Sequence, residues 1–490
     1  MDAATLALLM SKVQNPSIDP DDIDDTLSVS GKAADAKATG DAIAELGLRL
    51  GIIESNQVIG LEVDFENKTF KRLGAAYGKS KGADFNAYSM YGGRKRCNVT
   101  DGGIVTAYYG DTGYTEAGAL TQAVTIGETT YPVGTAVQVM VEQPKFYYYV
   151  CPLKTESQTS SGGIGDHLRK VQYYICAEQL PGFKLHPAFY DESGNEVDKI
   201  YIGAYEGCIY DVSASAYITD DSQIADFTAT TGDKFSSIAG VQPASGLTQQ
   251  LIRPRIETIC KNRGDGWHSL NIRIASMEQL LMIIELGTMN VQDGSGSDGI
   301  VNITNHSSYN CASFTGSTAS LGSASGQASS TKDYQNTDQT ANGKTAYSYR
   351  GVENPWGNIW KFVYGMNIWG DGTKHGGIPY ICKDYAFAES KNTDNYESAG
   401  FSIANESGYC NAIGYSSEYD WLMIPSEVGG NSTLPVGDSV FIVADLSGYR
   451  TARLGGANSN GNAAGSFYWA LGGGVETRYR DVGGRLVFIP

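Results

Sequence analysis

The sequence predicts an α+β protein that is rich in β-structure, with two main helices and long ordered loops. Three observations lead to this class. Glycine supplies 60 of the 490 residues, above the usual ~7%, while only 18% of the residues are charged. Strand-like patterns recur along the chain from about residue 59. Helix-like spacing of apolar residues occurs at only two places in that region.

The clearest strand candidates alternate apolar and polar residues or are rich in aromatic residues. Val137–Val150 (VQVMVEQPKFYYYV) does both, and Lys170–Ala177 and Lys199–Gly203 read in the same way. The chain ends with another apolar run, Leu486–Ile489. Because a terminal strand is ordered only when something ties it down, we expect Leu486–Ile489 and Val137–Val150 to lie in the central sheets.

Two segments have the apolar spacing and the end signals of helices. Arg253–Asn262 places its apolar residues on one face and ends before Gly264. Ser276–Leu286 opens with a capping box formed by its first and fourth residues, and it ends at Gly287. The middle of this second segment is apolar on every side, so we predict that this helix is buried.

Residues 1–58 differ in composition from the rest of the chain. They are dense in alanine, lack aromatic residues, and repeat apolar residues at a seven-residue spacing in Ala36, Ile43 and Leu50. This spacing predicts a short helical segment that forms a coiled coil and serves attachment and oligomerisation, with a homotrimer as the expected assembly. An ordinary amphipathic helix folded back on the main domain is the alternative.

Residues 59–490 predict one large domain, because strand patterns lie on both sides of the two helices. Residues 292–345 interrupt it: they are rich in Ser, Thr, Gly and Asn and contain few large apolar side chains. Such a composition cannot build a core of its own, so we predict a polar insertion at this place in the domain.

The net charge of −18 argues against partners that require a basic surface. Nucleic acids and anionic membranes both attract lysine and arginine, so neither is expected as a partner. No apolar run approaches the ~18 residues of a membrane-spanning helix, so membrane insertion is not expected either. The N-terminus also lacks the basic and apolar regions of a secretory signal.

No motif for catalysis or metal binding has all the residues that its chemistry needs. The eight cysteines include no C-x-x-C pair, and the five histidines lie far apart along the chain. Gly78–Gly82 matches the pattern G-x-S-x-G, but Ser80 lies between two lysines without the strand and helix that a nucleophile elbow needs. The sequence therefore predicts no enzyme, no cofactor and no metal site.

Two segments of the C-terminal third resemble a known family. Tyr349–Trp369 reads YRGVENPWGNIWKFVYGMNIW, and Gly455–Phe488 reads GGANSNGNAAGSFYWALGGGVETRYRDVGGRLVF. Together they resemble the C-type-lectin-like variable domains of phage tropism determinants, which are related in fold to formylglycine-generating enzymes. A glycine pair, a run of alternating positions, a G-x-R turn and a closing strand follow in the family's order. The head of the chain, LSVSGKAADAKATGDAI, is similar to the N-terminal segments of phage tail and fibre proteins.

The resemblance implies a C-type-lectin-like fold for residues 59–490 and a variable-type ligand-binding segment at 455–485. In the family, randomised template adenines turn AAY codons into NNY codons, which never encode Lys, Gln, Glu, Met or Trp. The positions that can arise in this way are the candidate receptor-binding residues: Ala457, Ser459, Asn460, Asn462, Ala464, Ser466, Ala470, Gly472, Gly473, Thr477, Tyr479 and Asp481. Glu476 cannot arise in this way, so it is a fixed residue or marks a slip in the pattern.

Four of the large residues in the two segments are the candidate scaffold: Trp356, Trp360, Trp469 and Arg485. Large rings in fixed loops are a normal core for a domain rich in small residues. We expect Arg485 to tie the closing strand to loop carbonyls or to a carboxylate. Among the variable-type positions we expect Tyr479 to be the strongest receptor contact, because its rigid ring combines a large area with a hydroxyl.

The function that the resemblance implies is that of a phage virion adhesin, a tail or head fibre protein that binds a bacterial cell-surface receptor, either protein or glycan. It implies location in the virion, assembly in the cytoplasm of the bacterial host, and contacts of the N-terminus with other virion proteins. One alternative is a structural decoration protein that binds no receptor. The other is an enzyme of the formylglycine-generating type, which needs a late cysteine pair; Cys382 and Cys410 lie outside the final segment.

Overall fold

The computed structural model describes residues 23–24, 33–34, 56–159, 162–219, 223–303, 312–329, 345–373, 375–389 and 395–490. Near the N-terminus it places two short strands, β1 (Ile23–Asp24) and β2 (Ala33–Ala34), which pair in parallel. The predicted helix is therefore wrong at Ala33–Ala34. The heptad positions Ala36, Ile43 and Leu50 lie outside the described residues.

The largest sheet combines strands from both halves of the chain. Among the described residues it has fourteen strands: β3 (Ile59–Asp64), β4 (Thr69–Gly74), β10 (Tyr147–Ser157), β11 (Asp166–Cys176), β12 (Lys184–Leu185), β21 (Trp360–Asp371), β22 (Ile378–Cys382), β23 (Tyr396–Ser398), β24 (Gly408–Tyr415), β25 (Pro425–Val428), β26 (Ser439–Phe441), β27 (Ser447–Leu454), β28 (Trp469–Gly473) and β29 (Val482–Gly483). Ten of them follow the order β12-β10-β11-β24-β26-β28-β27-β21-β22-β23. Strand β3 pairs with β11 on one side and with β4 on the other. The first strand of the main body therefore already belongs to this sheet.

A second sheet carries the end of the chain. In the described part its six strands are β5 (Lys95–Thr100), β6 (Val105–Tyr108), β9 (Val137–Pro144), β13 (Lys199–Gly203), β17 (Trp267–Ser269) and β30 (Leu486–Phe488). Their order is β17-β30-β13-β9-β5-β6, so β30 has an antiparallel neighbour on each side. The prediction that Leu486–Ile489 pairs inside a sheet is confirmed.

Smaller sheets and short helices complete the described body. The small sheets contain β7 (Val124–Ile126) and β8 (Thr129–Tyr131); β14 (Cys208–Asp211), β15 (Ala216–Tyr217) and β16 (Lys234–Ser236); and β18 (Gly326–Ser329), β19 (Thr345–Tyr349) and β20 (Val352–Glu353). The α-helices are α3 (Ser89–Gly92), α4 (Arg253–Lys261), α5 (Ile272–Leu286) and α6 (Val291–Ser295), and the 3₁₀ turns are η2 (Ala83–Ala87), η4 (Pro187–Phe189), η5 (Ala319–Leu321) and η6 (Gly461–Ala463). None of the described helices is long and apolar enough to span a membrane.

The predicted α+β class is wrong in its balance, since 37% of the structure is strand and only 12% is helical. The protein is mainly β, with several sheets arranged around one long helix. Many strands have only two to five residues and lie between glycine-containing turns. A strand of that length is too short for alternation to be recognised in the sequence, which is why the β content was underestimated.

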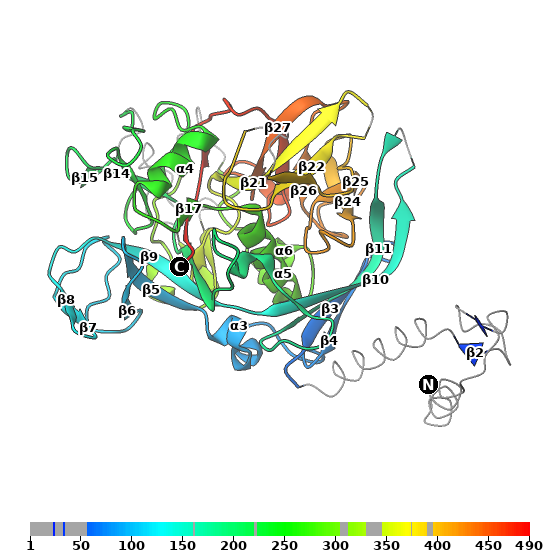
Figure 1. Cartoon of the computed structure of the whole chain (residues 1–490), viewed down its shortest axis with the longest axis horizontal. Helices are drawn as coiled ribbons and strands as arrows, with labels where there is room; N and C mark the ends of the chain where they lie inside the picture. Colours follow the sequence, from blue (N-terminus) through cyan, green and yellow to red (C-terminus); the bar gives the residue numbers. More distant parts are fainter. Residues whose placement is uncertain are drawn as a thin grey trace.

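Helix α5 lies at the centre of the body and contacts strands of the largest sheet (Figure 1). Its side chains are buried on nearly every side, as predicted. Its start was predicted wrongly: the helix begins at Ile272, and the Asn271 side chain accepts a hydrogen bond from the Ile274 N–H. Ser276 lies within the helix and donates to the carbonyl oxygen of Trp421.

The other predicted elements are partly confirmed. Helix α4 covers Arg253–Lys261, close to the predicted range. The segment Val137–Val150 forms two strands, β9 and β10, which belong to different sheets. The break comes at Pro144, which has no N–H to continue a ladder of hydrogen bonds. One sequence pattern therefore supplies a strand to each of the two main sheets.

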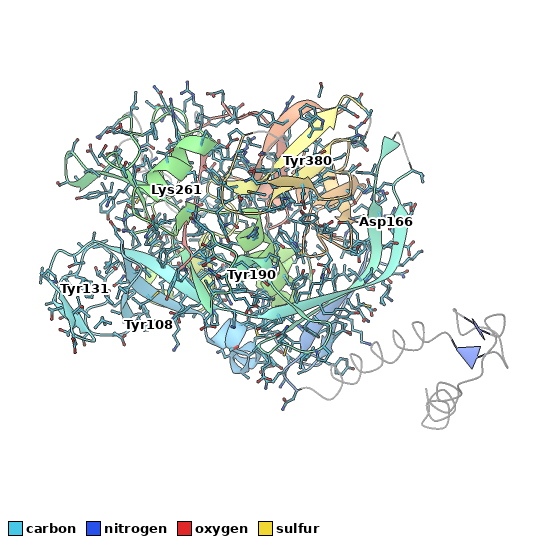
Figure 2. The ribbon with its side chains drawn as sticks, viewed as in Figure 1. Tyr108, Tyr131, Asp166, Tyr190, Lys261 and Tyr380 are labelled. Carbon is cyan, nitrogen blue, oxygen red and sulfur yellow. The ribbon has the colours of Figure 1, made fainter. Side chains whose placement is uncertain are left out.

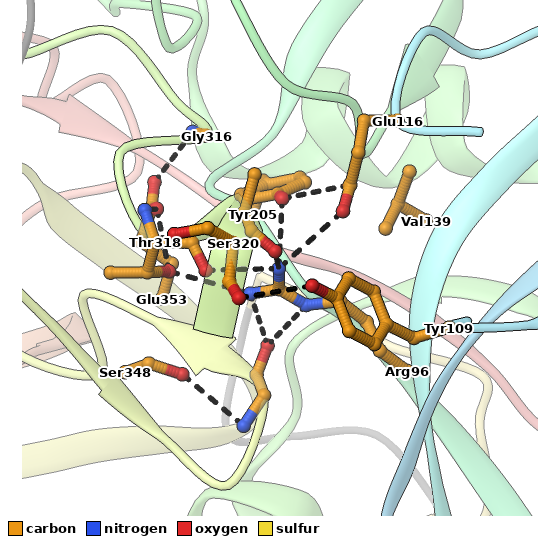
Figure 3. A network of polar contacts seen from close by, with 12 residues as sticks. Arg96, Tyr109, Glu116, Val139, Tyr205, Gly316, Thr318, Ser320, Ser348 and Glu353 are labelled. Atoms are coloured by element: carbon orange, nitrogen blue, oxygen red, sulfur yellow. Dashed lines mark hydrogen bonds and ion pairs between the residues drawn. The ribbon is translucent and has the colours of Figure 1, made fainter. Parts of the chain in front are cut away.

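A buried polar network connects the described end of the insertion to strand β5 (Figure 3). Arg96 has no exposed surface and donates to the carbonyl oxygens of Gly351, at 2.9 Å, and Thr318, at 3.3 Å. The hydroxyl of Tyr205 accepts from Arg96 at 3.0 Å. The Glu353 carboxylate accepts from the backbone N–H of Thr318 at 2.6 Å. Because unpaired buried polar groups are costly, this network holds Thr318, Gly351 and Glu353 against strand β5.

Candidate functional site

The candidate site is the C-terminal segment 455–485, which lies between β27 and β30. The segment begins after the last residue of β27. It contains the turn η6 and the strands β28 and β29, in that order. Strand β28 pairs with β26 on one side and with β27 on the other. The segment is therefore built into the largest sheet at several points, and Figure 1 shows it at the top of the body, next to β21 and β26.

The three scaffold tryptophans are buried beneath this segment. Trp469 has no exposed surface, and its indole N–H donates to the carbonyl oxygen of Met423 at 3.2 Å. Trp356 donates to the carbonyl oxygen of Asp298 at 3.0 Å. The ring of Trp360 packs on Tyr468, with 4.6 Å between ring centroids. Trp360 thus supports the segment at Tyr468, and Trp469 connects the segment to the carbonyl oxygen of Met423.

Arg485 is also buried and makes the type of contact that was expected. Its guanidinium donates to the carbonyl oxygens of Gly203 at 2.7 Å, Glu353 at 2.5 Å and Asn354 at 3.1 Å. Two of these carbonyls belong to the loop that begins at β20, and the third ends β13. One side chain therefore connects the closing strand to two other parts of the fold.

The twelve candidate receptor-binding residues differ widely in exposure. The exposed ones are Ser459, Asn462 and Tyr479. The half-buried ones are Asn460, Gly472, Gly473 and Thr477. The buried ones are Ala457, Ala464, Ser466, Ala470 and Asp481. The side chains of these last five residues face the interior, so they do not belong to the exposed surface of the site.

Packing explains why the buried candidates face inward. Ala470 pairs with Phe441 of β26 and with Arg453 of β27 inside the sheet. The hydroxyl of Ser466 lies 3.1 Å from the sulfur of Met282 in helix α5. Side chains along this segment therefore point in two directions. One set faces the interior, and only the other set faces solvent.

Tyr479 is the largest side chain of the site that reaches solvent, with 47% of its surface exposed. The Arg453 guanidinium lies 5.9 Å from the centre of the Tyr479 ring and 5.7 Å from that of Trp360. The Tyr479 carbonyl oxygen accepts from the backbone N–H of Gly246 at 2.9 Å and of Val482 at 3.2 Å. Both the ring and the backbone of Tyr479 are thus supported by fixed parts of the protein.

The structure adds three exposed apolar residues to this surface that the sequence did not indicate. Leu247 is 43% exposed and follows Gly246, whose N–H holds the Tyr479 carbonyl. Phe441 and Val443 are 47% and 39% exposed and lie against Gly472, where an added Cβ would come within 3.2 Å of the Phe441 ring. No local signal marks these residues, because tertiary pairing alone brings them to the segment.

Three arginines adjoin Tyr479. Arg478 and Arg480 are its neighbours in the sequence, and the guanidinium of the buried Arg453 lies 5.9 Å from the centre of its ring. Burial lowers the pKa of Arg453, and the nearby Asp481 acts in the opposite direction. Arg478, which precedes Tyr479 in the sequence, is exposed. Its guanidinium can therefore bind a negatively charged group of a partner.

A buried carboxyl group supports the turn that precedes β28. Burial raises the pKa of Asp438 well above its usual value, and its Oδ2 accepts from the Phe467 N–H at 2.7 Å. Gly465 lies so close to Asp438 that an added Cβ would be 2.1 Å from the carboxylate. Glycine is therefore required here by close approach, and its place in the variable-type segment is structural.

The described residues contain no cluster of three His, Cys, Asp or Glu side chains that could hold a metal ion. The cysteines of the described part are free, and Cys382 and Cys410 are buried. Burial raises the pKa of Cys382 to about 12 and also raises the pKa of Cys410.

Comparisons with known proteins place these findings beside two solved structures. No family model matches the sequence, and no curated protein matches it. The structure "Major Tropism Determinant P3c Variant" is similar at 11% identity and a TM-score of 0.24, over 81% of this chain and 73% of that chain. The structure "Major Tropism Determinant U1 Variant" is similar at 11% identity and a TM-score of 0.25, over 86% of this chain and 77% of that chain. Values this low carry no conclusion about fold or function.

Proposed function

We propose that this protein is a phage virion adhesin that presents the surface around Tyr479 to a receptor on a bacterial cell. The observation that carries the proposal is the division of the segment 455–485 into two sets of residues. The large fixed residues Trp469 and Arg485 are buried and hydrogen-bonded, whereas Ser459, Asn462 and Tyr479 reach solvent. A rigid frame under exposed side chains that tolerate change is what a diversified binding surface requires.

The composition of the exposed surface supports protein or glycan recognition. Tyrosine and arginine are the residues that most often dominate binding energy, and here Tyr479 stands beside Arg478. Leu247 and Phe441 add apolar area from outside the segment.

The assembly and the location follow from the same proposal. We place the protein in the phage particle, attached through residues 1–58 to other virion proteins and assembled in the host cytoplasm. A homotrimer would present three copies of the surface, and several weak contacts made together give a strong attachment. Residues 455–485 would then be the part that differs between isolates.

The proposal predicts that Tyr479→Ala weakens adsorption to host cells without unfolding the protein. Loss of a central tyrosine costs about 2 kcal/mol of binding energy, or about a thirtyfold rise in Kd. Thermal unfolding should change little, because the ring is 47% exposed. Adsorption of purified protein to host cells measures the first effect, and a thermal melt measures the second.

Tyr77→Ala is the matched control, since Tyr77 is 72% exposed and lies outside the segment. Adsorption that stays unchanged in Tyr479→Ala, Arg478→Ala and Ser459→Ala together would contradict the proposal. That result would instead favour a structural decoration protein that binds no receptor.

A further inference from the structure

A cavity of the described body lies apart from the surface around Tyr479. Its volume is about 350 Å³, and one wall consists of small residues, among them Ala117, Gly118 and Ala136. Tyr210 of β14 and Tyr217 of β15 also line the cavity. Pockets for small ligands measure ~300–1,000 Å³, so the space is large enough for one compact molecule.

The cavity lies at one end of the molecule. Ala117 and Gly118 precede β7, Ala136 follows β8, and Arg263 lies two residues after helix α4, which ends at Lys261. Figure 2 labels Lys261 and Tyr131 of β8 at the same side of the body. Strand β27, which the segment 455–485 follows, lies on the other side of α4 from β14 and β15 in Figure 1.

A carboxylate with a fixed orientation lines this cavity. Asp101 accepts through Oδ1 from Arg263, at 2.5 Å, and through Oδ2 from Lys234, at 2.9 Å. Its side chain is still 27% exposed. Each carboxylate oxygen can accept two hydrogen bonds, so each retains one acceptor site for a ligand. Two such sites on one carboxylate fit two hydroxyl groups on neighbouring carbon atoms.

A buried amide supplies a donor to the same space. Gln138 lines the cavity and is only 1% exposed. Its Oε1 accepts from the Ser237 N–H at 2.9 Å, which fixes the side chain with the amide nitrogen on the other side. The amide nitrogen carries two N–H donors, and these can bind a ligand oxygen in the cavity.

The two tyrosines form the apolar side of the cavity. Tyr210 and Tyr217 meet edge to face, with ring centroids 5.1 Å apart and an angle of 68° between the planes. Tyr217 is held close to Gly118, where an added Cβ would lie 2.2 Å from its hydroxyl and φ is +81°. An aromatic face carries partial negative charge and attracts the C–H bonds on one face of a sugar ring.

We propose that this cavity binds a single sugar unit. Two neighbouring hydroxyls donate to Asp101, a third oxygen accepts from the Gln138 amide, and the C–H face of the ring lies on Tyr210. A phosphate-bearing ligand fits less well, because the Asp101 carboxylate would repel it. The inference does not depend on the function proposed for residues 455–485.

The test measures binding of methyl glycosides of glucose, galactose, mannose, rhamnose and N-acetylglucosamine to the full chain by saturation-transfer NMR and calorimetry. At least one of them should bind with a Kd of about 1 mM, a value that corresponds to ~4 kcal/mol. Tyr210→Ala and Gln138→Leu should each raise that Kd at least fivefold. Ala117→Trp, a change at an exposed wall residue, should abolish binding by filling the cavity.

Tyr479→Ala serves as the matched control and should leave sugar binding unchanged. Thermal melts of all variants establish that each one is folded. If none of the five glycosides binds, or if binding persists in folded Ala117→Trp, the proposal is wrong. Loss of sugar binding in Tyr479→Ala would also overturn it, since the sugar would then occupy the other surface.

Discussion

His268 lies on strand β17 between two carboxylates. Its Nδ1 is 2.7 Å from Glu257, and its Nε2 is 2.8 Å from Glu192. Burial would lower the pKa of His268, but Glu257 and Glu192 outweigh burial and raise the pKa above its usual value. The pKa of His186 shows what burial does without such partners: it falls to about 3. Neighbouring charges therefore decide the protonation of a buried imidazole.

This geometry predicts a pH-dependent stability. Because the pKa of His268 is raised in the folded state, its contribution is complete below the unfolded value of 6.5 and is lost as the pH rises through the folded value. Glu192→Gln should therefore lower the free energy of unfolding more at pH 5.5 than at pH 8.5. Urea unfolding at the two pH values measures this difference, and NMR titration of His268 should show a lower pKa in the variant.

Glu128→Gln is the matched control, because Glu128 is exposed in the turn between β7 and β8. It should change stability little at either pH. An equal loss of stability at both pH values in Glu192→Gln would show that His268 is not the group responsible.

At the scale of elements, the closing strand β30 depends on contacts made by the turn before it. Arg485 is buried and donates to three carbonyl oxygens from β13 and from the loop after β20. Removing the guanidinium leaves these carbonyls in the interior without a partner. The strand itself has only three residues, so its pairing with β13 and β17 cannot compensate.

Arg485→Ala should consequently lower the free energy of unfolding by about 3 kcal/mol or more. Urea unfolding of the purified protein measures the loss. Arg478→Ala, a change at an exposed arginine of the same segment, should have little effect on stability. Equal stability of the two variants would mean that the contacts of Arg485 do not hold β30 in place.

At the scale of the whole molecule, we predict a homotrimer whose assembly depends on residues 1–58. The apolar residues that recur at a seven-residue spacing there need a partner surface, which other copies of the chain would supply. Sedimentation of the full chain should give a trimer, and deletion of residues 1–58 should give a folded monomer. A trimer that persists after the deletion would place the assembly contacts in the main body.

Several elements could be predicted because their signals are local. The spacing of apolar residues predicts helix α4, the burial of α5 and the strand at Leu486–Ile489. Gly287 predicts the end of α5, where φ is 74°. The anchoring role of Arg485 could be inferred because a large charged residue in a segment of small residues needs partners.

Other features were decided by tertiary structure alone. The pattern of the segment 455–485 could not show that Ala470 faces the sheet, because its direction depends on pairing with β26 and β27. Leu247 and Phe441 join the site from distant parts of the chain. By itself the sequence determined where helices and strands form, where they end, and which types of residue anchor the segment. The three-dimensional packing determined whether each residue faces the interior or solvent. The physical reason is that burial depends on neighbours distant in sequence, and no local pattern records them.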